Sequence, residues 1–236
     1  MAGNSERRVL EGPVGDLEVV LDAPEGAAHG FAFVGHPHPL YGGSLDNKVV
    51  ATLARTFVGL GWLAVRMNFR GVGASAGVYD EGNGETQDFL HLIEAISHGP
   101  AWEALVPQPA PIALAGYSFG SFVAANAAQE LARRGRPARA LVLVGAAAGK
   151  WPMPDVDAGS VVIHGEVDET IPLADVFTWA RRSEVPVTVI PGADHFFHRR
   201  LGTIKQIVLR NLSLVLNPDM GASAPSPAED QVHDTN

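Results

Sequence analysis

Residues 112–134 read IALAGYSFGSFVAANAAQELARR, and the pattern of apolar residues changes within this run. Residues 112–115 are apolar without a break, which is typical of a strand buried on both faces of a sheet. From residue 119 onward, small and apolar residues recur at helical spacing. A short buried strand that turns directly into a helix predicts one unit of a parallel α/β sheet.

The same alternation of short apolar runs and helical stretches extends outward over most of the chain. It predicts strands at residues 8–11, 17–21, 30–35, 63–68, 112–115, 140–145, 161–164 and 187–190. It predicts helices at residues 46–60, 85–97, 119–134, 173–182 and 204–216. A Gly-Pro…Gly-Asp turn joins the first two strands, so we expect them to form an antiparallel hairpin. The predicted fold class is α/β, with a doubly wound and mostly parallel sheet of about eight strands and helices on both faces.

Composition excludes several classes of protein. The chain has 236 residues, of which 46% are hydrophobic, and it carries a formal net charge of −9 and no cysteine. It therefore has no cysteine nucleophile or thiolate metal site, no electrostatic footprint for nucleic acid, and no basic helix for a membrane surface. We expect one domain over residues 1–216 and a disordered, acidic, proline-containing tail over residues 217–236. Without a secretory signal at residues 1–8, the chain is expected to be cytoplasmic. No sequence feature indicates its oligomeric state.

Two segments match the pattern Gly-x-Ser-x-Gly, one around Ser75 and one around Ser118. Ser118 follows the strand at residues 112–115 and opens the helix at residues 119–134, which is the setting of a nucleophile elbow. Ser75 lies in a glycine-rich loop with no helix directly behind it, which favours a loop-forming role. Ser118 is the candidate nucleophile, and a helix N-cap is the alternative role for it.

A serine nucleophile needs a general base and an acid that orients the base. His195 follows the predicted strand at residues 187–190 and is the candidate base, with His198 as the fallback. Asp168 follows the strand at residues 161–164 and is the candidate acid; Glu166 and Glu169 are lesser candidates. Asp194 adjoins His195 and is expected to brace its loop instead, because neighbours in sequence rarely face each other.

These motifs together resemble the α/β-hydrolase superfamily, and in particular the compact bacterial group of dienelactone-hydrolase-like serine esterases. The resemblance is carried by residues 35–50, 68–77, 82–88, 116–120, 164–172 and 192–197 and covers about residues 10 to 215. It implies a triad of Ser118, Asp168 and His195. It also implies an oxyanion hole formed by the backbone N–H of Phe119 and a second N–H from the loop after the third strand. Pro37 and Pro39 have no N–H, so His38 is the leading candidate for the second donor and Leu40 the next.

The segment between the strands at residues 140–145 and 161–164 is too short for a lid domain. We therefore expect an open substrate pocket whose mouth is lined by aromatic side chains, those of Tyr41, Tyr117, Phe119, Trp151, Phe196 and Phe197. Such a site favours the cleavage of a small-molecule carboxylic ester with a small or exposed acyl group, through an acyl-enzyme and without a cofactor.

Several alternatives stay open at this point. The same triad serves thioesterases, peptidases and acyltransferases, and a hydrolase fold can also act as a non-catalytic binding protein. His36 and His38 form a metal-like pair that His164, His195 or His198 could join, but no clear three-ligand set emerges, so no metal is predicted. His36 is expected to be a buried, hydrogen-bonded histidine. Arg70 is expected to pair with Asp88 or to cap carbonyls in its loop, with recognition of a substrate carboxylate as the alternative.

Overall fold

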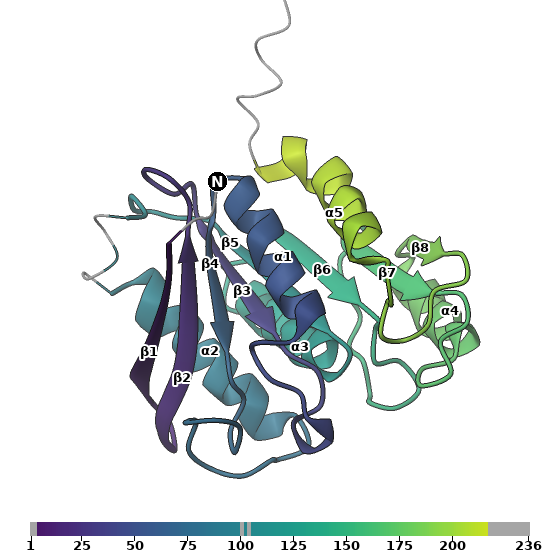
Figure 1. Ribbon diagram of the computed structural model, residues 1–236, viewed down its shortest axis with the longest axis horizontal. Helices are drawn as coiled ribbons and strands as arrows, with labels where there is room; N and C mark the ends of the chain where they lie inside the picture. The colour runs from purple at the N-terminus through teal and green to yellow at the C-terminus, as the bar shows by residue number, and fades with distance from the viewer. Residues whose placement is uncertain (1–3, 100–101, 103–104, 217–236) are drawn as a thin grey trace, which may run out of the picture.

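A computed structural model describes residues 4–99, 102 and 105–216 of the chain. It contains one eight-stranded sheet with the strand order β1-β2-β4-β3-β5-β6-β7-β8 (Figure 1). The strands are β1 (Asn4–Gly12), β2 (Gly15–Ala23), β3 (Phe31–Gly35), β4 (Leu63–Met67), β5 (Ile112–Tyr117), β6 (Ala140–Val144), β7 (Val161–Gly165) and β8 (Val187–Ile190). The helices are the 3-10 helix η1 (Pro39–Tyr41) and the α-helices α1 (Lys48–Gly59), α2 (Asn83–Ser97), α3 (Phe119–Arg133), α4 (Leu173–Ser183) and α5 (Leu201–Leu216).

The sheet is mostly parallel, as predicted from the alternation of strands and helices. β1 and β2 form the expected antiparallel hairpin, and β2 is also antiparallel to β4. The remaining pairs, from β4 through β3, β5, β6 and β7 to β8, are all parallel. The carboxyl ends of these strands therefore lie along one edge of the sheet, where ligands bind in doubly wound folds.

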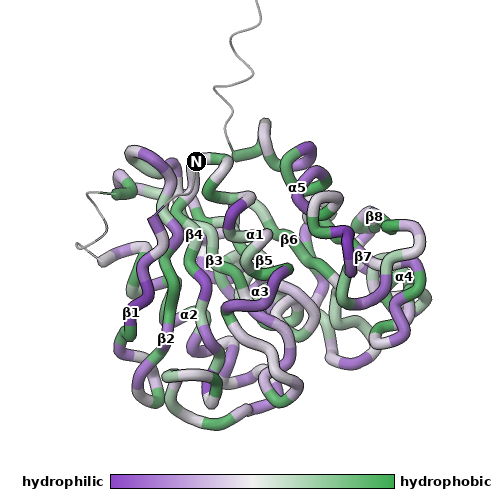
Figure 2. Tube along the Cα trace, viewed as in Figure 1, coloured by the Kyte–Doolittle hydropathy of each residue, from purple (hydrophilic) through white to green (hydrophobic). Residues whose placement is uncertain are grey.

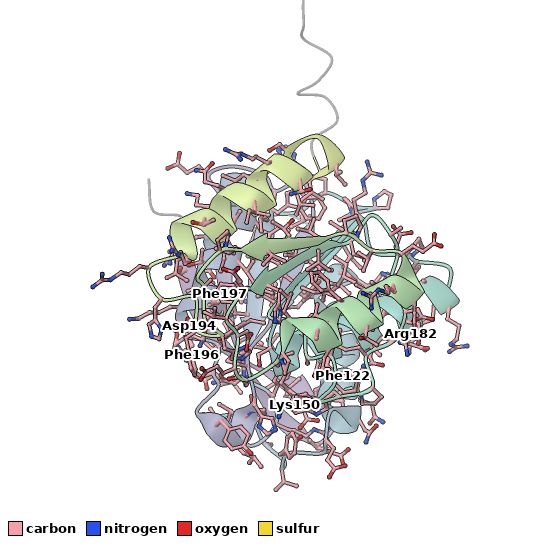
Figure 3. All side chains as sticks on the ribbon, turned by 90° about the vertical axis from the view of Figure 1, so that its right-hand side faces the viewer. Phe122, Lys150, Arg182, Asp194, Phe196 and Phe197 are labelled. Atoms are coloured by element: carbon pink, nitrogen blue, oxygen red, sulfur yellow. The ribbon has the colours of Figure 1, made fainter. Side chains whose placement is uncertain are left out.

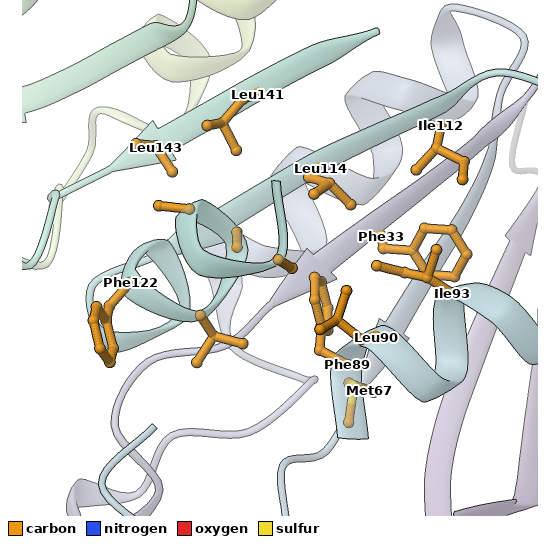
Figure 4. Close-up of a cluster of buried hydrophobic side chains, with 14 of the residues drawn as sticks. Phe33, Met67, Phe89, Leu90, Ile93, Ile112, Leu114, Phe122, Leu141 and Leu143 are labelled. Carbon is orange, nitrogen blue, oxygen red and sulfur yellow. The ribbon is translucent and has the colours of Figure 1, made fainter. Parts of the chain in front are cut away.

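Helices cover both faces of the sheet, again as predicted (Figure 1). On one face α1 and α5 pack against the sheet and share a core that includes Phe57, Trp62 and Val208. On the other face α2, α3 and α4 share a core that includes Phe33, Phe89 and Leu114, part of which Figure 4 shows. Each large side chain buried this way contributes about 1.5–3 kcal/mol relative to an exposed one. These two cores hold the sheet as a rigid platform for the loops at its edge.

The element boundaries differ from the predictions mainly at the first strand. β1 begins at Asn4 and ends at Gly12, whereas the sequence pattern indicates only residues 8–11. Figure 2 shows that β1 is largely hydrophilic while the inner strands are hydrophobic. Because β1 is an edge strand with mostly exposed side chains, its backbone pairing with β2 defines it, and hydrophobic patterning does not. The helix η1 was not predicted, since a single turn leaves no periodic signal.

Two further predictions concern segments outside the cores. The segment between β6 and β7, residues 145–160, contains no helix and hence no lid, in agreement with the prediction. The tail predicted at residues 217–236 lies outside the described residues. Within the part of the chain that the structure describes, none of the helices is both long and apolar enough to cross a bilayer.

Candidate active site

Ser118 lies at the turn between β5 and α3, where the backbone is strained. Its φ of 54° and ψ of −123° are rarely adopted by a residue with a side chain, and its N–H donates to the carbonyl of Val144 at 2.9 Å. The turn closes because two neighbours lack side chains: a Cβ on Gly116 would lie 2.0 Å from the Gly120 oxygen, and one on Gly120 would lie 2.4 Å from Gly35. The sequence pattern therefore places Ser118 where an elbow requires it.

His195 and Asp168 meet Ser118 at the carboxyl edge of the sheet. The Oγ of Ser118 lies 3.0 Å from Nε2 of His195, and Nδ1 of His195 lies 2.7 Å from Oδ2 of Asp168. An ionised Asp168 only accepts hydrogen bonds, so Nδ1 carries the ring proton and Nε2 is free to accept the serine proton. The structure thus brings the three candidate residues together in the order alcohol, imidazole, carboxylate.

Backbone groups fix the orientation of Asp168. Its Oδ1 accepts hydrogen bonds from the amides of Thr170, at 2.9 Å, and Ile171, at 2.7 Å, and its side chain is fully buried. Oδ2 is thereby directed at His195. The buried ring of His164 lies below, with Nε2 2.9 Å from the carbonyl oxygen of Ile171 and 3.4 Å from Oδ2 of Asp168. Burial lowers the pKa of His164, so this ring stays neutral beside the carboxylate.

Tyr117 anchors the loop that carries His195. Its hydroxyl donates a 2.8 Å hydrogen bond to the carbonyl of His195, and the two rings lie 5.5 Å apart. Burial raises the pKa of Tyr117 well above its ordinary value, which keeps the hydroxyl protonated as a donor. The residue before the nucleophile therefore positions the backbone of the candidate base, a role that the sequence pattern did not reveal.

The competing residues are engaged elsewhere. Nδ1 of His198 lies 2.6 Å from the carboxylate of Asp194, which agrees with the loop-bracing role expected for that aspartate. The hydrogen bond with His198 lowers the pKa of Asp194. The buried Oγ of Ser75 donates to the carbonyl of Asn68 at 2.7 Å and accepts from the amide of Glu18 at 2.9 Å, so Ser75 has the predicted structural role.

Backbone amides near Ser118 are available to an oxyanion. The N–H of Phe119 is at the first position of α3 and therefore has no acceptor within the helix. In the loop after β3, the N–H of Leu40 donates to Nδ1 of His38, the N-cap of η1, at 3.2 Å. The carbonyl of His38 accepts from the amides of Tyr41 and Gly43, both at 3.1 Å. Between the two sequence candidates, His38 is thus the one whose amide is not used in this turn.

A cavity of about 540 Å³ opens over Ser118 and His195. Tyr41, Tyr117, Trp151 and Phe196 line it, as predicted. The predicted position of Phe197 is wrong: its side chain is fully buried and packs 6.3 Å from the ring of Tyr117 in the core under α5. In Figure 3, Asp194 and Phe196 lie next to each other in the loop after β8, and Phe197 is set back toward α5. The positive φ of Phe197, 53°, turns the two phenylalanines in different directions.

The ring of Phe119 is also absent from the cavity wall, contrary to the prediction. It is fully buried beneath the site, 5.2 Å from the ring of His38 and 5.3 Å from that of Trp151. From the first position of α3 its side chain enters the core, so only its amide is left at the site. Phe119 therefore supports the aromatic wall from below.

Seven residues were not predicted to line the cavity: Pro37, Gly42, Gly43, Asn47, Lys150, Thr170 and Ile171. All of them except Lys150 belong to segments already noted in the sequence for other reasons. Thr170 and Ile171 follow Asp168, and Asn47 is the N-cap of α1, where its side chain accepts from the amide of Val49. Lys150 lies in the segment between β6 and β7, which was noted in the sequence only because it is too short for a lid.

The loops around the cavity are braced by buried polar pairs. Arg70 forms two hydrogen bonds of 2.8 Å with Asp88, as predicted. His36 is fully buried, as predicted, with Nε2 accepting from the amide of Phe69 at 2.9 Å and Nδ1 2.6 Å from the carbonyl of Pro37. Both ring nitrogens of His36 are thus occupied. Over the described ranges, no three His, Cys, Asp or Glu side chains are grouped in a way that could hold a metal ion.

The burial of His36 predicts a loss of stability in acid. Burial lowers the pKa of this imidazole from 6.5 to about 4. The unfolded chain therefore binds the proton more tightly, and stability is lost as the pH falls from about 6.5 to about 4. Between pH 7 and pH 5 the protonation of His36 lowers the free energy of unfolding by about 2 kcal/mol. We therefore expect the free energy of unfolding of His36→Gln, measured in urea at the two pH values, to fall by about 2 kcal/mol less than that of the wild type. His29→Gln, at an exposed histidine, is the control; an equal loss in the wild type and His36→Gln would contradict the prediction.

Comparisons with known proteins find relatives in both structure and sequence. A lidless α/β serine hydrolase from Xanthomonas campestris superposes with a TM-score of 0.77 and 34% sequence identity, covering 95% of this chain and 97% of that chain. An α/β serine hydrolase homologue from Coxiella burnetii has a TM-score of 0.77 and 35% identity, covering 88% of this chain and 97% of that chain. The family model described as a thioesterase domain matches residues 62–153. An uncharacterized protein of Rickettsia prowazekii is 33% identical over 118 residues, which are 45% of this chain and 47%, or about half, of that relative.

Proposed function

The chain belongs to the α/β serine hydrolases, and we propose that it hydrolyses carboxylic esters with small or exposed acyl groups through an acyl-enzyme on Ser118. The observation that carries the proposal is the hydrogen-bonded row of Ser118, His195 and Asp168, with distances of 3.0 Å and 2.7 Å. A serine that caps a helix or fills a loop does not need an imidazole and a buried carboxylate aligned behind it.

The geometry supports the following sequence of steps. Ser118 Oγ attacks the ester carbonyl while Nε2 of His195 takes its proton. Asp168 stabilises the imidazolium that forms, and the amides of Thr170 and Ile171 keep its carboxylate in place. The imidazolium then protonates the leaving alcohol, the acyl group stays on Ser118, and His195 activates a water that hydrolyses it. No metal or cofactor is required in this mechanism.

The negative charge on the attacked oxygen needs hydrogen-bond donors. We assign this role to the amides of Phe119 and His38, with Leu40 as the weaker candidate because its N–H donates to His38 Nδ1. The N-terminus of the 15-residue helix α3 adds a favourable electrostatic potential at the same place. A donor of this kind stabilises the transition state by roughly 3–4 kcal/mol in well-studied sites.

The expected substrates follow from the open cavity. It lacks a lid between β6 and β7, and its aromatic wall at Tyr41 and Phe196 is exposed to solvent, so a long alkyl chain gains little additional burial beyond the rim. We expect kcat/KM for 4-nitrophenyl butyrate to exceed that for 4-nitrophenyl palmitate by about tenfold or more, as measured by release of 4-nitrophenol. A higher kcat/KM for the palmitate would contradict a preference for small acyl groups.

Thioester hydrolysis is the second candidate, because the thioesterase family model matches residues 62–153. The same acyl-enzyme would form from either substrate, and only the leaving group differs. Butyryl thioesters of N-acetylcysteamine, assayed beside the butyrate ester and a butyryl anilide, distinguish esterase, thioesterase and amidase activity through the ratios of kcat/KM.

A further inference from the structure

Lys150 is a cation at the candidate site that the proposed mechanism does not use. It lies in the loop after β6, as labelled in Figure 3. It lines the cavity together with Ser118 and His195. Lys150 is exposed, and within the described ranges none of the ion pairs involves its ammonium. The carboxylate of Asp175, which packs against the neighbouring Gly149, lines an adjacent cavity. An unpaired cation in a cavity is a binding group for an anion.

Two other side chains of the cavity wall, those of Asn47 and His38, also favour an anionic group. The residues that line the cavity include no aspartate or glutamate. Asn47 uses its Oδ1 to cap α1, which leaves its Nδ2 amino group as a donor. His38 accepts the Leu40 amide on Nδ1, so its neutral ring carries the proton on Nε2 and is a donor too. The wall thus offers a cation and two neutral donors.

We propose that the substrate carries an anionic oxygen group, a carboxylate or a phosphate, which Lys150 binds while the ester carbonyl lies at Ser118. This inference rests on the proposed function and narrows its substrate class. The apolar wall at Tyr41, Trp151 and Phe196 accommodates the carbon skeleton, and Lys150 selects among substrates of similar size. Recognition by Arg70, the alternative left open by the sequence, is ruled out by its buried pair with Asp88.

The test compares pairs of esters that differ in charge. Mono-4-nitrophenyl adipate and 4-nitrophenyl hexanoate place a carboxylate or a methyl group at the end of the same acyl chain. The sodium salt of 4-(butyryloxy)benzoate and its methyl ester make the corresponding comparison on the leaving-group side. A phosphate in the leaving group, as in 4-(butyryloxy)phenyl phosphate, distinguishes the two kinds of anion.

The measured quantity is the ratio of kcat/KM for the anionic ester to that for its neutral partner. Lys150→Met keeps the length of the side chain but removes its charge. We expect it to lower this ratio about tenfold or more, chiefly through KM, for the esters with the anion on the acyl side, on the leaving-group side, or on both. Lys150→Glu should lower it further. Lys205→Met in α5, which removes the same charge away from the cavity, should leave the ratio as in the wild type. The pair of esters whose ratio falls identifies the side of the substrate that carries the anion.

Two outcomes overturn the proposal, and they have different meanings. If the wild type hydrolyses the neutral esters but Lys150→Met changes no ratio, Lys150 does not bind the substrate and the ester hydrolase function stands. If the wild type turns over none of the esters and does not react with a fluorophosphonate, the proposed function fails as well.

Discussion

Ser118→Ala is expected to abolish reaction with a fluorophosphonate and to lower kcat/KM for 4-nitrophenyl butyrate by roughly 10⁴-fold or more. The reagent forms a bond between phosphorus and the serine oxygen and expels fluoride, so it needs the same activated hydroxyl as an ester does. Of the two serines in Gly-x-Ser-x-Gly segments, only Ser118 has an imidazole nitrogen within 3.0 Å of its Oγ. The measurements are intact-mass analysis of the labelled protein and steady-state kinetics.

Ser75→Ala is the matched control for this experiment. Its hydroxyl accepts from the buried amide of Glu18 and donates to the carbonyl of Asn68, so its removal leaves two backbone groups unsatisfied. We expect a loss of stability of about 1–3 kcal/mol, measured by urea unfolding, with labelling of Ser118 retained. If labelling survived in Ser118→Ala and disappeared in Ser75→Ala, the nucleophile would be Ser75 and the assignment of Ser118 would be wrong.

The fold class could be predicted from the sequence because the inner strands are buried on both faces. In β3, β5 and β6 every residue is buried, which produces short unbroken apolar runs that differ from the pattern of a helix with one apolar face. At β1 most side chains are exposed, so the hydrophobic pattern underestimates the length of the strand. The sequence predicts a doubly wound, mostly parallel sheet but not the order of its strands. The position of β4 between β2 and β3 leaves no local signal in the sequence.

The candidate site could be predicted to the extent that chain topology determines it. Residues that follow parallel strands meet at one edge of the sheet, and this brings residues 118, 168 and 195 together from positions far apart in the sequence. The direction of a side chain within a loop depends on backbone angles that composition does not encode. Phe196 lines the cavity and Phe197 enters the core because the backbone at Phe197 has a positive φ. Lys150 was missed for a related reason: nothing in a single cation between Gly149 and Trp151 indicates that it faces the cavity.

The stiffness of the surrounding loops connects the fold with the site. The loop after β3 is held through His36, whose ring accepts the amide of Phe69 in the loop after β4. That second loop is tied to α2 by the pair of Arg70 and Asp88. Donors and cavity wall are therefore set before a substrate arrives, as electrostatic stabilisation of a transition state requires.

Asp168→Asn tests whether the carboxylate sets the proton position on His195. Oδ1 of Asp168 accepts from two backbone amides, so in the variant the carboxamide oxygen must occupy that position and its NH₂ group must face His195. The amide then donates to Nδ1, the ring proton moves to Nε2, and the lone pair that accepts the serine proton is lost. We expect kcat/KM for 4-nitrophenyl butyrate to fall by about 10³–10⁴-fold, as the wrong tautomer does in serine proteases.

Asp194→Asn provides the control because it makes the same chemical change one residue from His195. Asp194 faces His198, not the ring of His195, so its replacement should change kcat/KM by less than about threefold. Thermal unfolding of both variants separates loss of the tautomer from loss of the fold, since the carboxamide has nearly the same shape as the carboxylate. If Asp168→Asn retained wild-type kinetics while Asp194→Asn lost them, the orienting acid would be Asp194. The 2.7 Å contact between Asp168 and His195 would then be structural only.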